Sequence, residues 1–306
     1  MRLHTSIFIL LVVLLGTIDE QFLGLRIGET LYAAEGERND PAELRRRADK
    51  GDAQAQFELG LMYAGGDGVP QDDAVAANWF RKAAEQGLEI AQHMLGFMYA
   101  LGRGVPQDYA EAAKWYSKAA EQGSAESQQL LGDIYNAGRG VPQDHAAAAK
   151  WYRKAAEQGN AEAQLRLGVL YTFGDGVPQD IAEAAKWLRK AAEQDQAQAQ
   201  LALGALYADG EVVPPDYAEA AKWLRKAAEQ GDAQAQSMLG AMYADGTGMP
   251  QNFVEGYAWL NVAAAQGEAN AIKARDEISQ RLSPPDLVTA QNRSKEYFAK
   301  YGAQSR

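Results

Sequence analysis

Tryptophan recurs in this chain of 306 residues at a constant interval of 36 positions. The interval holds for all six tryptophans of the sequence, which are Trp79, Trp115, Trp151, Trp187, Trp223 and Trp259. A Leu-Gly pair, a tyrosine and a proline keep the same step, starting from Leu59, Gly60, Tyr63 and Pro70. A fixed period of this length is the signature of a repeat architecture in which each unit is one small structural element. The chain is therefore predicted to contain six such units.

Each unit is predicted to form two helices joined by a loop. The first is typified by DAQAQFELGLMYAG, in which Leu59, Met62 and Tyr63 follow the spacing of a helix that is buried along one side. The second is typified by DYAEAAKWYSKAAEQG, where Asp108 and Glu111 resemble a capping box and Gly123 can end the helix. A glycine inside a helix costs roughly 1 kcal/mol relative to alanine. Gly60 and its equivalents therefore predict a close approach of the neighbouring helix.

A single helical pair of this size cannot bury its own apolar face, so the pairs are expected to stack. The predicted fold class is all-α, an α/α solenoid (superhelix) of six 36-residue helix-turn-helix repeats with helical caps. The predicted repeats are 52–87, 88–123, 124–159, 160–195, 196–231 and 232–267. Residues 35–51 are expected to form an N-terminal capping helix and residues 268–306 two C-terminal capping helices.

Residues 1–34 are predicted to be an export signal or an N-terminal anchor with a short spacer. Arg2 precedes the apolar run Ile7–Gly16, as in an export signal. The run is short for a membrane span, which needs about 20 apolar residues. Three interpretations stay open: a cleaved signal, an uncleaved anchor, or an apolar start without a targeting role. We expect an exported protein, periplasmic or secreted, with membrane contact only through an uncleaved anchor.

Composition excludes several classes of function. The formal net charge is −11, which disfavours nucleic acid and anionic membrane surfaces as main partners. Because the chain has no cysteine, it has no disulfide, no thiolate nucleophile and no cysteine-ligated zinc.

The loop GGDGVPQD, Gly65 to Asp72, is predicted to be a turn. A phosphate-binding loop would need a lysine followed by serine or threonine after the glycines. A metal loop would need an oxygen ligand at its centre, whereas that position varies among the repeats: Asp67, Arg103, Arg139, Asp175, Glu211 and Thr247. His4, His93 and His145 have no evident catalytic partner in the sequence. No catalytic residue, cofactor or metal is predicted, and the tryptophan column is interpreted as core packing and not as a surface that stacks on carbohydrate.

The unit resembles the Sel1-like repeat family, which is related to the tetratricopeptide repeats. The first unit carries the family pattern at Ala55, Leu59, Gly60, Tyr63, Gly66, Gly68, Val69, Asp72, Ala76, Trp79, Ala83, Ala84 and Gly87. The resemblance implies an α/α solenoid that binds other proteins as an adaptor or scaffold, and it does not imply an enzyme. Two departures, Asp195 and Val212 at positions that are glycine in the other units, predict a local change in the angle between helices.

The variable positions of the first helix are the candidate partner-binding site. In the first unit they are residues 54, 57, 61, 64 and 65, and in tetratricopeptide-like stacks these positions line the concave face. The candidates are Phe57, Leu61, His93, Phe97, Leu101, Gln129, Asp133, Asn136, Leu165, Val169, Phe173, Leu201, Asp209, Ser237 and Asp245. Two interpretations stay open: a solvent-facing groove that binds a partner, or packing between neighbouring first helices.

The function predicted from the sequence is a non-enzymatic scaffold or adaptor. It would bind a protein or peptide partner of unknown identity through the concave face of the solenoid, in the cell envelope. The alternative is an envelope enzyme or a glycan-binding module built on the same solenoid. That alternative would require a pair of clustered carboxylates or an exposed tryptophan.

Overall fold

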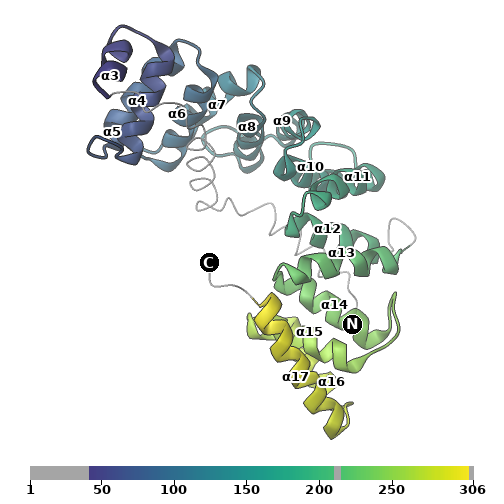
Figure 1. The fold of residues 1–306 in the computed structure, drawn as a ribbon. Helices are drawn as coiled ribbons and strands as arrows, with labels where there is room; N and C mark the ends of the chain where they lie inside the picture. Colours follow the sequence, from purple (N-terminus) through teal and green to yellow (C-terminus); the bar gives the residue numbers. More distant parts are fainter. Residues whose placement is uncertain (1–40, 210–214, 303–306) are drawn as a thin grey trace. The chain divides into compact units, whose positions relative to one another are not determined.

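The computed structural model describes residues 41–209 and 215–302, and this part of the chain consists of fifteen α-helices and contains no strand (Figure 1). The predicted export segment, residues 1–34, and Val212 lie outside the described residues. The first helices of the six repeats are α4 (Ala53–Gly65), α6 (Glu89–Leu101), α8 (Ala125–Ala137), α10 (Ala161–Phe173), α12 (Ala197–Ala208) and α14 (Ala233–Asp245). The second helices are α5 (Asp73–Glu85), α7 (Tyr109–Glu121), α9 (His145–Glu157), α11 (Ile181–Glu193), α13 (Tyr217–Glu229) and α15 (Phe253–Ala265). They are preceded by α3 (Pro41–Asp49) and followed by α16 (Ala269–Ser279) and α17 (Pro284–Tyr301).

The helices form two compact units, and the division between them falls within α10. In the N-terminal unit, which contains α3 to α9, each helix packs against the helix before it and the helix after it. In the C-terminal unit, the same pattern runs from α11 to α16. Sequential packing of this kind is what a solenoid requires. The predicted α/α solenoid of helical pairs is therefore confirmed.

The glycine inside each first helix lies directly against a large side chain of the second helix. A Cβ atom on Gly60 would lie 2.6 Å from the ring of Phe80, and one on Gly132 would lie 2.6 Å from the ring of Tyr152. In the C-terminal unit, a Cβ atom on Gly204 would lie 2.7 Å from Cγ of Leu224. These distances are too short for two carbon atoms, so only glycine lets the helices approach this closely. The predicted reason for the helix-interior glycines is confirmed.

In four of the repeats, a buried glutamine joins the repeat to the one before it. Gln92 in α6 donates a hydrogen bond from its side-chain amide to the carbonyl of Ala84 in α5, at 3.1 Å. The oxygen of the same amide accepts from Gln122, which follows α7, at 2.8 Å. The same pair of bonds is made by Gln128 with Ala120 and Gln158, by Gln200 with Ala192 and Gln230, and by Gln236 with Ala228 and Gln266. Each glutamine thus connects three helix segments and satisfies a carbonyl at a helix end.

The tryptophan column lies in the core, as predicted. Trp79 is 4% exposed and Trp115 is 9% exposed, whereas Trp151 is half-buried. A lysine ammonium covers the outer side of the ring, as Lys82 does over Trp79 at 3.8 Å. Because Trp79 and Trp115 are enclosed by core side chains and a lysine, these indoles are not presented to solvent as flat stacking surfaces.

The loop GGDGVPQD is a hydrogen-bonded joint between two helices. Gly66 and Gly68 have φ angles of 80° and 71°, which favour glycine. The amide of Gln71 donates to the carbonyl of Ala64, and the Asp72 carboxylate caps α5 by accepting from backbone N–H groups. The structure thus agrees with the predicted turn.

The varying residue at the centre of this loop faces the preceding repeat. A Cβ atom on Gly104 would lie 2.0 Å from the carbonyl oxygen of Asp73, so this loop packs directly on the start of α5. The neighbouring Arg103 forms an ion pair of 3.1 Å with Asp73. The loop therefore holds two repeats together, and in this repeat its central Arg103 pairs with a carboxylate of the preceding repeat.

The capping boxes expected in the second helices form only in part. The Asp108 carboxylate accepts from the N–H groups of Ala110 and Glu111, as a cap should. The Glu111 side chain pairs with Lys114, however, and the N–H of Asp108 donates to the carbonyl of Tyr99. A carbonyl of the first helix α6 therefore accepts from the Asp108 N–H, which is the group that the Glu111 side chain was expected to contact.

The last helix closes the C-terminal unit in a different way from a seventh helical pair. Helix α17 packs on α15 and α13, where the ring centroid of Trp259 lies 4.5 Å from that of Tyr297 and 5.5 Å from that of Tyr301. The sequence of α15 suits this contact because Ala258, Asn261 and Val262 stand where most of the other second helices have lysine, arginine and lysine. The Tyr301 carbonyl also accepts from Gln236, which belongs to the glutamine network.

Asp195 provides a test of local backbone strain. It has a φ angle of 60° and stands at the end of a second helix, where the other repeats have glycine. Left-handed backbone costs a residue with a Cβ about 1 kcal/mol. We expect Asp195→Gly to raise the free energy of unfolding by up to about 1 kcal/mol, measured by urea titration. The reverse change in a neighbouring repeat, Gly159→Asp, should lower it, and equal stability of all three proteins would contradict this account.

Candidate functional site

Four equivalent positions lie along one side of each first helix. In α4 they are Gln54, Glu58, Leu61 and Gly65, which are half-buried or exposed and lie on one face because they are spaced by four, three and four residues. The corresponding residues are Ile90, Met94, Phe97 and Leu101 in α6, and Glu126, Leu130, Asp133 and Ala137 in α8, of which Met94, Phe97, Leu130 and Asp133 are buried. We call these twelve residues the N-terminal stripe. The corresponding residues of α12 and α14 are Gln198, Ala202, Ala205, Asp209, Gln234, Met238, Ala241 and Asp245, and we call them the C-terminal stripe.

The structure places the candidate partner-binding residues in two groups. Eight are buried: Phe57, His93, Phe97, Asp133, Asn136, Leu165, Val169 and Leu201. Six are half-buried, namely Leu61, Leu101, Gln129, Phe173, Asp209 and Ser237, and Asp245 is exposed. Most of the eight buried residues therefore pack within the solenoid, as the packing interpretation expects. The half-buried and exposed residues are the ones that a partner can contact without rearrangement.

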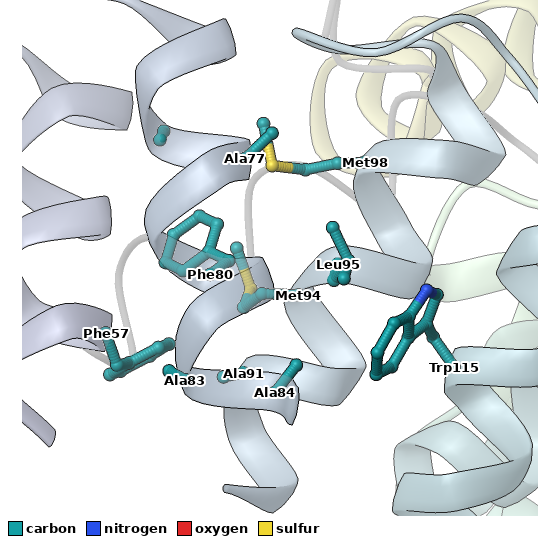
Figure 2. Close-up of a cluster of buried hydrophobic side chains, with 11 residues drawn as sticks. Phe57, Ala77, Phe80, Ala83, Ala84, Ala91, Met94, Leu95, Met98 and Trp115 are labelled. Atoms are coloured by element: carbon teal, nitrogen blue, oxygen red, sulfur yellow. The ribbon is translucent and has the colours of Figure 1, made fainter. Parts of the chain in front are cut away.

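Phe57 shows why a variable position can belong to the core. Its ring centroid lies 5.5 Å from that of Phe80, and it belongs to a cluster with Met94 of the next first helix (Figure 2). Phe97 packs in the same way with Leu130 and Ile134 of the helix that follows. Position 57 therefore faces the neighbouring first helix and not solvent.

The sequence analysis missed the position next to it. Glu58 and Met238 are half-buried members of the two stripes, at equivalent places in their repeats. A signal was available, because the residue at this position differs widely: Glu58, Met94, Leu130, Arg166, Ala202 and Met238. Whether position 57 or position 58 faces solvent depends on how each helix is rotated about its own axis, and the structure defines that rotation.

The polar residues of the third repeat form an internal network. The Asp133 carboxylate accepts a hydrogen bond of 2.7 Å from the Tyr152 hydroxyl and another from the Gln129 amide. The Asn136 side-chain oxygen lies 2.8 Å from Nδ1 of His145. These bonds satisfy buried polar groups within the protein, as buried groups require. These hydrogen bonds connect α8 to α9, so they use the polar groups inside the protein and do not present them to a partner.

His93 is held in its neutral form by burial. Its Nδ1 atom lies 2.8 Å from the Ser127 hydroxyl of the next first helix. Burial lowers the pKa of His93 to about 4, and the carboxylate of Glu126 opposes this shift. His93 is therefore a neutral core residue at pH 7.

Neither a metal centre nor a membrane span emerges from the described residues. No group of three or more histidine and acidic residues in this part of the chain is placed to hold a metal ion. Among the described helices, none is both long enough and apolar enough to cross a bilayer.

His93 gives the protein a predictable dependence on pH. The unfolded chain protonates this histidine below about pH 6.5, whereas the folded chain resists protonation down to about pH 4. The unfolded state therefore gains stability as the pH falls through this window. We expect His93→Gln to reduce the loss of unfolding free energy between pH 7 and pH 5 by roughly 2 kcal/mol in urea titrations. The half-buried His145, changed to glutamine, is the control and should leave that loss in place; equal effects of the two changes would contradict the prediction.

Comparison with known proteins identifies the repeats. The model of the Sel1 repeat matches residues 53–88, 90–124, 125–160, 161–196, 197–232 and 233–268. A Sel1 repeat protein from Oxalobacter formigenes of known crystal structure is 33% identical, with a TM-score of 0.59, covering 74% of this chain and 100% of that one. A protective antigen with an SLR fold from uropathogenic Escherichia coli strains is 29% identical, with a TM-score of 0.47, covering 90% of this chain and 83% of that one.

A search of the curated proteins finds no match. The six family matches nevertheless cover more than half of the chain and follow the 36-residue period. They also coincide with the six pairs of first and second helices. The chain belongs to the Sel1 repeat family.

Proposed function

We propose that this protein is a non-enzymatic scaffold of the cell envelope that binds a protein partner through the stripes of its first helices. Solenoids of Sel1 repeats are typically scaffolds for protein interactions. The observation that carries the proposal is the difference between the two layers of helices. The second helices repeat nearly the same sequence, as in AAKWYSKAAE, AAKWYRKAAE and AAKWLRKAAE, whereas each stripe has its own set of side chains.

A preformed surface suits this role. Backbone that is fixed by helix packing before binding loses little conformational freedom when a partner arrives. The stripes lie on helices whose other sides are buried in the stack, so their side chains are presented from a rigid base. Leu61 and Leu101 supply apolar contacts in the N-terminal stripe, and Gln129 lies beside it.

A glycan-binding module has less support. Such a module would stack sugar rings on exposed aromatic faces, but Trp79, Trp187 and Trp223 are at most 5% exposed. Export to the envelope is supported only by the sequence of residues 1–34, in which Arg2 is followed by the apolar run Ile7–Gly16.

Site-specific crosslinking in the native cells tests the proposal. A photoreactive amino acid at Gln54 or Leu61 should give discrete protein adducts, because both positions lie in the N-terminal stripe. The same group at Asn78, an exposed position of the second helix α5, is the matched control and should give none of these adducts. Adducts that form only at Asn78 would overturn the assignment of the binding surface. Recovery of the protein from the cytoplasm alone, with residues 1–34 intact, would overturn the assignment to the envelope.

A further inference from the structure

An arginine and a tyrosine join neighbouring helices at four or more places in the described chain. Arg81 of α5 donates a hydrogen bond of 2.7 Å to the hydroxyl of Tyr99 in α6, and its Cζ atom lies 5.9 Å from the centroid of that ring. The same hydrogen bond joins three other pairs: Arg45 and Tyr63, Arg189 and Tyr207, and Arg225 and Tyr243. The helical stack therefore contains a recurring place that fits a guanidinium group.

The tryptophan of the following second helix also contacts this guanidinium in the first repeat. The Cζ atom of Arg45 lies 5.6 Å from the ring centroid of Trp79, and the ammonium of Lys82 lies 3.8 Å from the same centroid. One tryptophan thus contacts two cations, so the lysine does not occupy the place of the guanidinium. We call the place between the tyrosine and the tryptophan the guanidinium site.

The third repeat has a guanidinium site without its arginine. Ser117 of α7 stands 36 residues after Arg81, at the position that supplies the guanidinium elsewhere. Its hydroxyl donates to Glu121 of the same helix, at 3.3 Å. The equivalent tyrosine, Tyr135 of α8, is half-buried, and its hydroxyl has no hydrogen-bond partner among the described residues. The chain itself therefore leaves this site open.

The tryptophan of the same site is more exposed than its equivalents. All six tryptophans are described, and five of them are at most 9% exposed, whereas Trp151 of α9 is half-buried. Lys154 lies over the Trp151 ring, at 4.2 Å from its centroid. In α13 the carboxylate of Glu219 accepts from the indole N–H of Trp223, but Ala147 holds the position of that glutamate in α9. The third repeat thus lacks two side chains that contact the tryptophan in other repeats.

The groups around the open site suit a guanidinium better than an ammonium. Tyr135 and Trp151 pack against the same core cluster and offer aromatic rings, which attract cations. The exposed carboxylate of Glu121 forms no ion pair with the other described residues, so it can accept from an incoming cation. A guanidinium donates to several acceptors at once while its flat face lies against a ring, and the compact, strongly hydrated ammonium of lysine cannot do both.

We propose that the guanidinium site formed by Ser117, Tyr135 and Trp151 binds an arginine side chain of a protein partner. The partner's guanidinium takes the place that arginines of the chain fill elsewhere, donates to the Tyr135 hydroxyl and the Glu121 carboxylate, and lies against Trp151. A protein is the expected source because Sel1 repeat proteins generally bind protein partners. None of these residues belongs to the stripes, so the site adds a second, separate contact to the proposed function.

Fluorine NMR of the full chain labelled with 5-fluorotryptophan tests the inference, with signals assigned by single Trp→Phe variants. The probe is acetyl-Gly-Arg-Gly-amide, and the comparison peptide is acetyl-Gly-Lys-Gly-amide. The arginine peptide should shift the Trp151 signal in a saturable way, and the lysine peptide should bind at least about threefold more weakly. The Trp79 signal should not shift, because Arg45 already contacts that ring.

Three results of this experiment would overturn the inference. The first is an equal response of Trp151 to the two peptides. The second is no shift of the Trp151 signal at millimolar concentrations of the arginine peptide. The third is a shift produced by an oligosaccharide, maltotetraose, and not by the arginine peptide, which would assign the exposed indole to glycan binding.

Two substitutions at Ser117 locate the site. Ser117→Arg supplies the guanidinium from the chain itself, as in other repeats, and should abolish the response of Trp151 to the arginine peptide. Ser117→Ala removes the hydroxyl, leaves the site open, and should keep the response. Equal responses of the two variants would contradict the assignment. Circular dichroism should show unchanged helicity in both.

A matched pair of tyrosine variants tests the hydrogen bond without changing Ser117. Tyr135→Phe removes the acceptor at the open site and should weaken binding of the arginine peptide about fivefold. Tyr99→Phe removes the equivalent hydroxyl at a site that Arg81 fills, and it should leave binding unchanged. Equal effects of the two variants would place the peptide elsewhere on the protein.

Crosslinking in the native cells tests whether a protein supplies the arginine. A photoreactive amino acid at Lys150, which is exposed and precedes Trp151, should give an adduct whose crosslinked segment contains arginine. Ser117→Arg should remove this adduct and Ser117→Ala should keep it. No adduct, or an adduct that Ser117→Arg leaves in place, would overturn the assignment to a protein partner. Failure of the stripe adducts at Gln54 and Leu61 alone would overturn the proposed binding surface and leave this inference standing.

Discussion

The close contact between a glycine of the first helix and a large side chain of the second helix is the constraint on which the other features of each repeat depend. At Gly60, Gly132 and Gly204 the side chain of the partner helix occupies the space that a Cβ atom would fill. This contact fixes the distance between the two helices, and that distance positions the loop, the tryptophan and the buried glutamine. The glutamine network, the loop and the lysine-covered tryptophans then join one repeat to the next.

The repeated positions are used for packing, which leaves function to positions that vary. The loop GGDGVPQD satisfies backbone groups and contacts the preceding repeat, and the second helices hold most of the cations in structural contacts. What remains accessible on the first helices is a stripe of different side chains in each repeat.

The sequence predicted the helical pairs, the close approach at the glycines, the buried tryptophans and the turn, because each depends on a local pattern that recurs. It did not predict the role of Gln92 and its equivalents, since a polar residue in a helix ordinarily indicates a solvated side. Phe57 and Phe97 illustrate the remaining difficulty: whether a variable residue faces solvent or the next helix depends on the angle between repeats. The packing of α17 on α15 could have been predicted from Ala258 and Val262, which interrupt the pattern of basic residues in the second helices.

The most direct test of this account is the free energy of unfolding of Gly132→Ala. Helix propensity alone predicts that alanine stabilises the protein by about 1 kcal/mol. The structure predicts that alanine destabilises the protein, because its Cβ atom would lie 2.6 Å from the ring of Tyr152, whose hydroxyl donates a hydrogen bond to Asp133. A loss of about 1–3 kcal/mol in urea unfolding would support the close contact as the organising constraint. A gain in stability would contradict it.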